Sequence, residues 1–186
     1  NALYGFINMI NKIIKEENPS YIMVAFDKGK TFRHEKYKDY KAGRDATPED
    51  LKLQFPAAKR LCVALGIKYF EIDNYEADDI IGTFAKEIDQ NDDFIATIVS
   101  SDKDLLQLIS DDVTVKLLKA SDYIMMDEDE FKNTYGIEPI KMIDLKALMG
   151  DASDNIPGVK GVGEKTALTL LKKYKSLEGV YEHLPE

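Results

Sequence analysis

The sequence predicts an α/β domain with a mostly parallel central sheet flanked by helices, followed by a smaller helix–hairpin–helix element. Three observations lead to this class. Short, fully apolar runs have the pattern of buried strands. Segments with apolar residues at helical spacing alternate with these runs, as in parallel sheets. A glycine-rich turn at 158–163 lies between two helical segments. We therefore expect an α/β core over 1–149 and a helical element over 150–186.

Each expected element follows from a local pattern of this kind. Strands are expected at 21–26, 67–70, 94–99, 113–118 and 123–126. Helices are expected at 2–16, 47–65, about 76–88, 105–109, 127–134, 139–149, 163–174 and 177–183. Thr47 is expected to cap the second helix, with Pro48 as its first residue. The polar segment 28–47 has no clear period, so we expect a long loop, and such loops are usually functional.

Length and composition set broad limits on the function. The 186 residues suffice for one core, or for one domain with a small appendage. The single cysteine, Cys62, excludes a disulfide framework and a cysteine-ligated zinc site. No apolar run is long enough to span a membrane and no signal peptide is visible, so we expect a cytoplasmic protein with no membrane partner.

The charges are unevenly distributed along the chain. The net charge is −9, yet residues 28–44 contain seven Lys or Arg and residues 160–175 contain five Lys. Basic segments in an otherwise acidic chain are typical of a surface that grips phosphates beside a carboxylate site. A plain solvated face remains the alternative for each basic segment.

Acidic residues occur at four places where a site would form. They are Asp27; Glu76, Asp78 and Asp79; Asp102 and Asp104; and Asp151 with Asp154. Several of them follow expected strands, and ligands bind beyond the carboxyl ends of parallel strands. Carboxylates gathered there would repel one another unless cations lie among them, and all-oxygen ligands favour Mg²⁺ or Mn²⁺. Two such cations are the usual means of phosphodiester hydrolysis. Acids at a helix start also simply favour the helix dipole.

Other catalytic devices fit the sequence poorly. There is no Gly-x-Ser-x-Gly elbow and no P-loop, and only two histidines are present. The run Gly158-Val-Lys-Gly-Val-Gly163 follows Asp-Asn-Ile-Pro rather than a strand, so it fits a hairpin between two helices. The free N–H groups of that hairpin could bind a DNA phosphate, with Lys165 and Thr166 beside it. A plain turn between helices remains the alternative.

Six segments, taken in order, resemble the 5′ nuclease family, and within it the 5′→3′ exonuclease domain of bacterial DNA polymerase I. They are Phe26-Asp27, Phe32-Arg-His-Glu35, Tyr40-Lys-Ala-Gly-Arg44, Tyr75-Glu-Ala-Asp-Asp79, Ser101-Asp-Lys-Asp-Leu105 and the run 150–166. The resemblance extends over essentially the whole chain. It implies a PIN-like or resolvase-like core and a metal-dependent 5′→3′ exonuclease or flap endonuclease.

The resemblance also implies roles for individual residues. The metal ligands would be Asp27, Glu76, Asp78, Asp79, Asp102, Asp104, Asp151 and Asp154, holding two Mg²⁺ ions that Mn²⁺ can replace. Lys41 and Arg44 would act on the scissile phosphate, and Arg33 would also contact DNA. Residues 28–47 would form the arch through or beneath which a single-stranded 5′ end passes. Gly158, Gly161, Gly163, Lys165 and Thr166 would grip duplex DNA, where relatives bind K⁺.

Some points stay open at the level of the sequence. A helical wheel pairs Glu76 with Asp79, whereas the family motif pairs Glu76 with Asp78. A family strand ending in Asp-Gly-Asn, which carries another ligand, is expected upstream of Asn1. We expect a monomer that acts on DNA 5′ flaps or 5′ ends in the bacterial nucleoid, with fusion to a polymerase left open. The alternatives are a non-catalytic branched-DNA-binding module and a small RNA nuclease, which the hairpin disfavours.

Overall fold

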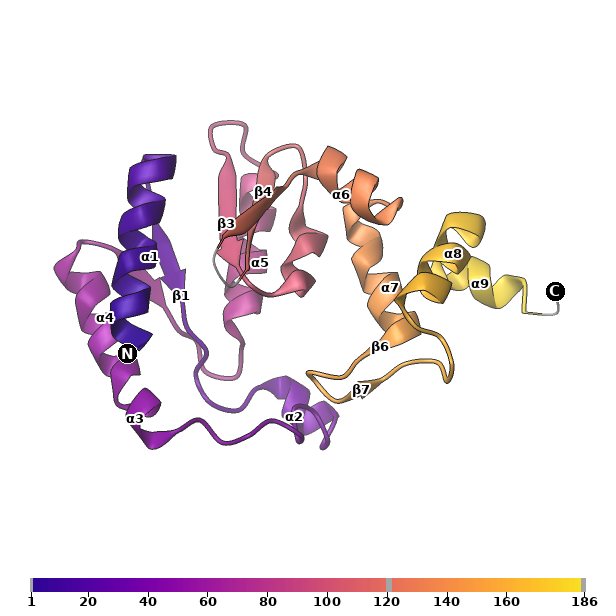
Figure 1. Ribbon diagram of the computed structural model, residues 1–186, viewed down its shortest axis with the longest axis horizontal. Coiled ribbons are helices and arrows are strands. Elements are labelled where there is room, and N and C mark those ends of the chain that lie inside the picture. The colour runs from indigo at the N-terminus through magenta and orange to yellow at the C-terminus, as the bar shows by residue number, and fades with distance from the viewer. Residues whose placement is uncertain (1, 120–121, 185–186) are drawn as a thin grey trace. The chain divides into compact units, whose positions relative to one another are not determined.

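A computed structural model describes residues 2–119 and 122–184 (Figure 1). The chain forms two compact units, one from residues 1–35 and 44–80 and the other from residues 36–43 and 81–186. Helix α5 (Ala77–Ile88) begins in the first unit and continues in the second. Within the described ranges, no helix combines the length and apolar character that a membrane crossing needs.

The first unit contains a parallel pair of strands and the helices beside it. Its elements are α1 (Ala2–Glu17), β1 (Met23–Ala25), α2 (Phe32–Lys36), α3 (Glu49–Lys52), α4 (Gln54–Ala64), β2 (Lys68–Phe70) and the first turn of α5. Val24 of β1 lies opposite Tyr69 of β2. Buried Ile10, Cys62 and Ile67 form its core, so α1 and α4 pack together beside the strands, as Figure 1 shows.

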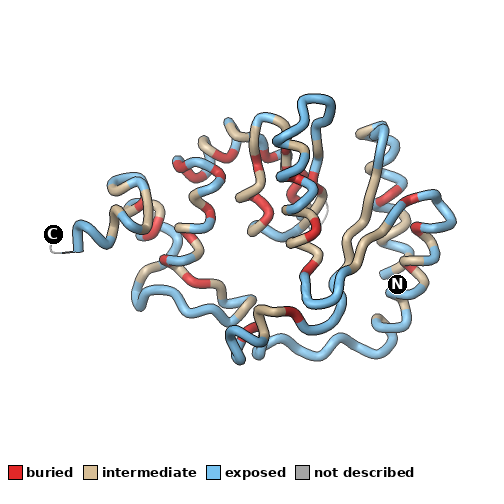
Figure 2. The backbone as a smooth tube through the Cα atoms, turned by 180° about the vertical axis from the view of Figure 1, so that it is seen from behind, coloured by how far each residue is buried: buried red, intermediate tan, exposed pale blue. Residues whose placement is uncertain are grey.

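The second unit has a larger apolar core. Its elements are the rest of α5, β3 (Ala96–Ser100), the 3₁₀ helix η1 (Lys103–Leu108), β4 (Val113–Leu118), β5 (Tyr123–Met126), α6 (Glu128–Tyr135), the 3₁₀ helix η2 (Pro139–Lys141), α7 (Met142–Met149), β6 (Gly150–Asp151), β7 (Ile156–Pro157), α8 (Glu164–Tyr174) and α9 (Leu177–Glu182). Strand β4 pairs in parallel with β3 and antiparallel with β5. Figure 2 shows buried residues along these elements in red.

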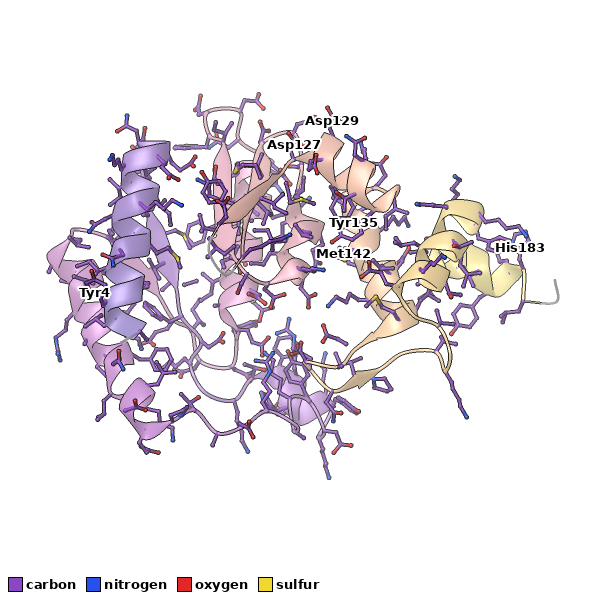
Figure 3. The ribbon with its side chains drawn as sticks, viewed as in Figure 1. Tyr4, Asp127, Asp129, Tyr135, Met142 and His183 are labelled. Atoms are coloured by element: carbon purple, nitrogen blue, oxygen red, sulfur yellow. The ribbon has the colours of Figure 1, made fainter. Side chains whose placement is uncertain are left out.

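Local sequence signals explain where several elements begin and end. Asp127 caps α6 by accepting a hydrogen bond from the N–H of Glu130 at 2.8 Å. Gly136 ends that helix with a φ of 69°, a conformation that favours glycine. Tyr135 and Met142, labelled with Asp127 in Figure 3, are buried in the core of the second unit. The apolar residues that the helical pattern predicted to be buried in this region therefore face the core.

The predicted α/β class is confirmed, whereas two local predictions were wrong and one pair of short strands was missed. Thr47 is not the helix cap, because Pro48 is extended at ψ 143° and takes the N-cap position, so α3 begins at Glu49. The segment 28–47 is not all loop, because it contains α2. The short antiparallel pair of β6 with β7 was not expected from the sequence.

Long-range contacts explain why α2 escaped prediction. Thr31 forms a parallel bridge with Asn74, and the N–H of Phe32 donates to the Asn74 carbonyl at 3.1 Å. The rings of Phe32 and Tyr75 meet edge to face with centroids 5.8 Å apart. The helix thus depends on partners more than forty residues away in the sequence, which a local pattern does not reveal.

Candidate functional site

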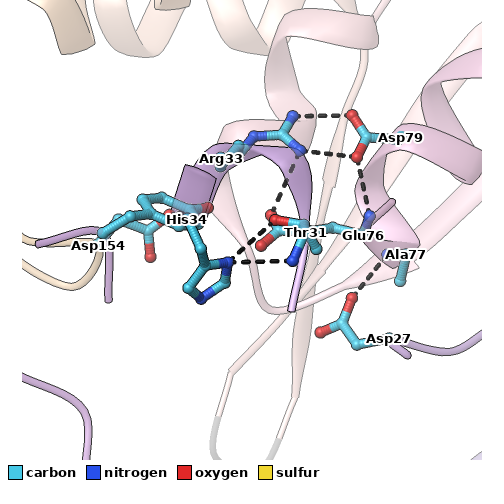
Figure 4. Close-up of polar contacts among 9 residues, drawn as sticks. Asp27, Thr31, Arg33, His34, Glu76, Ala77, Asp79 and Asp154 are labelled. Atoms are coloured by element: carbon cyan, nitrogen blue, oxygen red, sulfur yellow. Dashed lines mark hydrogen bonds and ion pairs between the residues drawn. The ribbon is translucent and has the colours of Figure 1, made fainter. Parts of the chain in front are cut away.

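In the first unit, the acidic residues gather where α5 begins (Figure 4). Asp27, two residues after the end of β1, accepts a hydrogen bond at Oδ1 from the N–H of Ala77 at 2.6 Å. Glu76, one residue before the helix, is 6% exposed, whereas Asp78 and Asp79 are half-buried in its first turn. A strand end and a helix start therefore bring Asp27 next to the backbone of the Glu76–Asp79 turn.

Arg33 of α2 forms a two-pronged ion pair with Asp79. Its two terminal nitrogens lie 2.7 and 2.8 Å from Oδ2 and Oδ1 of Asp79, and one of them lies 3.8 Å from Glu76 Oε2. Asp79 Oδ2 also accepts from the N–H of Glu76 at 2.8 Å. The guanidinium lies 4.6 Å from the centroid of the Phe32 ring. A half-buried cation thus balances acids of this turn.

In the second unit, Asp102 and Asp104 follow β3. Asp102 caps the 3₁₀ helix η1, because its Oδ1 accepts from the N–H of Asp104 at 2.8 Å. Asp102 is exposed, and Asp104 is half-buried. The Asp-x-Asp motif therefore has one side chain in a capping role and a second that is turned towards the interior.

Lys146 of α7 lies between two acids of the second unit. Its Nζ is 2.7 Å from Asp104 Oδ1 and 2.5 Å from Asp151 Oδ2. Burial opposes the charge of Lys146, but its bonds to Asp104 and Asp151 outweigh burial and raise its pKa above 10.5. Burial likewise opposes ionisation of Asp151, yet Lys146 and Ser153 lower the pKa of Asp151 to about 2. The ammonium of Lys146 therefore lies where the two carboxylates favour a positive charge.

Asp104 differs from Asp151 in how well its oxygens are satisfied. Its Oδ1 is buried, and its close contact among the described residues is the ion pair with Lys146 Nζ at 2.7 Å. Burial raises the pKa of Asp104 and outweighs the attraction of Lys146. A buried carboxylate oxygen whose close contact is an ammonium fits a role as a ligand to a hard cation, whose preferred donors are oxygens.

Asp151 ends β6, and Asp154 lies in the loop between β6 and β7. Asp151 Oδ1 accepts from the N–H and the hydroxyl of Ser153, at 2.8 and 2.7 Å. Asp154 Oδ2 accepts from the hydroxyl of Tyr40 at 2.9 Å. Lys41, next to Tyr40, is half-buried, and Arg44 is exposed. The structure thus brings Lys41 close to Asp154 within the second unit.

The predicted eight-acid cluster is only partly assembled within the two units. Among the described residues, no three His, Cys, Asp or Glu side chains are gathered closely enough to hold a metal ion. In the second unit Asp104 and Asp151 share Lys146, and in the first Glu76 and Asp79 share Arg33. Convergence of the two groups of acids stays a prediction.

Sequence reasoning missed Lys146 and Tyr40. Lys146 stands five residues before Asp151 in the last turn of α7, where a basic residue favours the helix dipole and attracts little notice. Tyr40 was noted only as part of the arch motif. Their partners in the folded chain, not their local patterns, mark them as parts of the site.

The glycines of the C-terminal hairpin have different structural reasons. A Cβ on Gly158 would lie 2.2 Å from the backbone carbon of Met149, so only glycine fits this close approach. Gly161 has a φ of 82°, and Gly163 is the N-cap of α8 with open space around its Cα. Lys165 and Thr166 are exposed in the first turn of α8. Packing explains Gly158, and the N–H groups at the start of α8 remain accessible for an anion.

The fold defines the chain as a resolvase-like α/β domain followed by a helical SAM fold. Residues 1–136 match the model of the 5′-3′ exonuclease N-terminal resolvase-like domain, and residues 137–186 match the 5′-3′ exonuclease C-terminal SAM fold. The chain therefore belongs to the 5′-3′ exonuclease family, a family of nuclease enzymes. The resemblance and the fold class predicted from the sequence are confirmed.

Known relatives agree with this assignment. DNA polymerase I of Bacillus caldotenax is 48% identical over 189 residues, which cover 100% of this chain and 21% of that protein. The chain spans about a fifth of the length of the curated relatives it matches. The structure of T5 5′-exonuclease with divalent zinc ions bound matches with a TM-score of 0.82 and 26% identity, covering 99% of this chain and 71% of that one. A bacteriophage T5 flap endonuclease complex with DNA and metal ions matches with a TM-score of 0.82 and 25% identity, with the same coverage.

Proposed function

We propose that the chain is a metal-dependent, structure-specific 5′ nuclease domain that hydrolyses DNA phosphodiesters at 5′ ends and flaps. The observation that carries this proposal is the pair of partly buried acids Asp104 and Asp151, which meet at Lys146 Nζ at 2.7 and 2.5 Å. Two carboxylates that already surround one positive charge could also coordinate a divalent ion, which prefers oxygen ligands. The T5 relatives, which are described with divalent metals and with DNA, support the same class of chemistry.

We assign the metal ligands to both units. Asp104, Asp151, Asp102 and Asp154 would serve in the second unit, and Asp27, Glu76 and Asp78 in the first, with Asp79 held by Arg33. Two bound Mg²⁺ ions, which Mn²⁺ can replace, would lower the pKa of a water and stabilise the attacking and leaving oxygens. The residues themselves orient this site, because Asp151 is fixed by Ser153 and Asp154 by Tyr40.

The basic segments would bind the substrate. Lys41 and Arg44 belong to the arch 28–47 and would stabilise charge on the scissile phosphate. Residues 150–186 would grip duplex DNA through the hairpin and the start of α8, with K⁺ as a further ion there, while 1–149 form the nuclease core. We expect a monomer, part of a DNA polymerase in the longer protein, that acts in primer removal and repair in the bacterial nucleoid, as the polymerase relatives suggest.

A single-turnover cleavage assay on a DNA 5′ flap tests this function. With Mg²⁺ the chain is expected to cut, and with Ca²⁺ to bind DNA without cutting, because the looser coordination of Ca²⁺ positions water poorly. Lys41→Ala should slow the chemical step by about 10²–10³-fold, the usual effect of losing one donor to a developing charge. Lys165→Ala, the matched lysine in the hairpin element, should weaken binding and leave the rate at saturating DNA unchanged.

Two outcomes would count against the proposal. Tight binding of branched DNA without cleavage in Mg²⁺ would favour a non-catalytic binding module. Cleavage of single-stranded RNA in preference to DNA flaps would favour an RNA nuclease. DNA affinity should also fall steeply with salt concentration despite the net charge of −9. If the dependence of log affinity on log salt concentration corresponds to fewer than about two phosphate contacts, the basic segments do not form the DNA-binding surface.

A further inference from the structure

The short segment 36–43 is hydrogen-bonded to the loop that carries Asp154. The N–H of Lys41 donates to the Asp154 carbonyl at 2.9 Å, and the hydroxyl of Tyr40 donates to Asp154 Oδ2 at 2.9 Å. Asn155 Nδ2 donates to the Asp39 carbonyl at 2.8 Å. The two stretches belong to one compact unit although more than a hundred residues separate them in the sequence.

Tyr40 is the anchor of this junction. Within 36–43, all of which the structure describes, Tyr40 alone is buried, with 5% of its surface exposed. A buried tyrosine hydroxyl normally finds a partner, and here the partner is a carboxylate, which makes the bond stronger than one between neutral groups. The bond fixes Oδ2 of Asp154 and thereby the orientation of the whole carboxylate group.

Lys41 is held in an unusual backbone conformation at the same junction. Its φ is 58°, in the left-handed region, and that of Asn155 across the junction is 57°. A lysine in this region is strained and persists there only where its surroundings hold it. The N–H of Lys41 bonds to the Asp154 carbonyl, and its Nζ lies 5.0 Å from the Tyr40 ring centroid. The position of the lysine therefore depends on Asp154 and Tyr40.

We propose that Tyr40 is a positioning residue that couples the Lys41 segment to cation binding at Asp154. The inference rests on the proposed function, which makes Asp154 part of a metal site. When Tyr40 orients the carboxylate, a cation binds it more tightly, since partners that orient ligands commonly set metal affinity. Because coupling between two sites is reciprocal, the bound cation in turn holds the Lys41 segment in place.

The test compares Tyr40→Phe with Tyr37→Phe in the same chain. Both changes remove one phenol hydroxyl, but Tyr37 is exposed and donates to the backbone carbonyl of Asn155 at 3.2 Å, not to a carboxylate. Calorimetric titration with Mn²⁺ gives the affinity, and timed trypsin digestion at Lys36, Lys38 and Lys41 reports how firmly the segment is held. Neither measurement depends on nuclease activity.

In the unsubstituted chain, Mn²⁺ is expected to slow trypsin cleavage of the segment. Tyr40→Phe should lower Mn²⁺ affinity about tenfold and abolish this protection, as loss of an orienting partner typically does. Tyr37→Phe should change neither by more than about twofold. In the reciprocal variant, Asp154→Ala, trypsin should cleave at Lys41 faster than in the unsubstituted chain, even without metal. This second variant tests the junction even if Tyr40→Phe fails to fold.

The outcomes separate this inference from the function on which it rests. If the unsubstituted chain binds no Mn²⁺, the proposed function and this inference both fail. If it binds Mn²⁺ and Tyr40→Phe binds equally well, the inference alone is overturned. Equal weakening by Tyr37→Phe and Tyr40→Phe would also overturn it, because a general loss of packing would then explain the effect.

Discussion

Arg33 holds both carboxylate oxygens of Asp79, at 2.7 and 2.8 Å, across 46 residues of sequence. The neighbouring acid, Asp78, stands one helical position away on the same first turn of α5. Both oxygens of Asp79 are bonded to a guanidinium, and one also accepts from the N–H of Glu76, so a metal ion would have to displace Arg33 to bind Asp79 through them. This relationship distinguishes two residues that the sequence alone left equivalent.

We therefore expect Asp78→Asn to weaken Mn²⁺ binding by at least about tenfold, since changing even a residue that only orients a ligand commonly costs that much. Asp79→Asn should change Mn²⁺ affinity less and should lower thermal stability, because Arg33 loses its charged partner. Calorimetry with Mn²⁺ and thermal unfolding in EDTA, applied to both variants, measure the two effects. The reverse ranking of the two affinities would assign the ligand to Asp79.

Lys146 is expected to stabilise the metal-free chain and to compete with a divalent ion. Lys146→Met would leave Asp104 and Asp151 close together without a cation, at a cost of about 1–3 kcal/mol for this partly exposed group. Added Mg²⁺ should then raise the melting temperature of Lys146→Met more than that of the unsubstituted chain. Thermal unfolding in EDTA and in Mg²⁺ provides the measurement.

The control for that variant is Lys132→Met on α6. Lys132 lies 2.9 Å from Glu128 and 3.0 Å from Glu138 at the surface, and exposed ion pairs contribute little. The melting temperature of Lys132→Met should differ only slightly from that of the unsubstituted chain, and by the same amount in EDTA and in Mg²⁺. Unchanged stability of Lys146→Met in EDTA would show that the two acids do not need the ammonium.

Gly158 and Gly163 should differ in their tolerance of a side chain. Gly158→Ser would force a Cβ to within 2.3 Å of the Gly150 nitrogen, and overpacking of this kind costs about 1–3 kcal/mol. Gly163→Ser has open space and places a preferred residue at the N-cap of α8, so no loss of stability is expected. Urea unfolding of both variants compares them. Equal stability would mean that the close backbone approach at Gly158 can relax.

Cys62 is expected to be unreactive until the first unit opens. Its side chain is 0% exposed between Ile10 and Ile67, and burial raises the pKa of the thiol above its ordinary value. Because only the thiolate reacts, a raised pKa keeps the thiol neutral to higher pH. Reaction with a thiol reagent at pH 8 should be at least about a hundredfold slower than in urea, given ordinary domain stability. A rate close to that of the unfolded chain would place Cys62 outside a stable core.

The sequence by itself determined the order of the longer strands and helices and the chemical identity of the site acids. Apolar runs such as 113–118 and the Asp127 cap depend on neighbours in the chain, so local patterns predicted them. The same holds for the motif that assigned the family. Where local signals compete, as at Thr47 and Pro48, the backbone of the proline decided the helix start, and the predicted start was wrong by one residue.

The tertiary structure alone decided which side chains act together. Lys146 reaches Asp104, Arg33 reaches Asp79 across 46 residues, and Tyr40 reaches Asp154 across 114. No local pattern encodes such pairs, because they form only when packing brings distant elements into contact. The sequence therefore named the acids, and the fold selected the cations and the hydroxyl that hold them, since burial makes each unpaired charge too costly to leave alone.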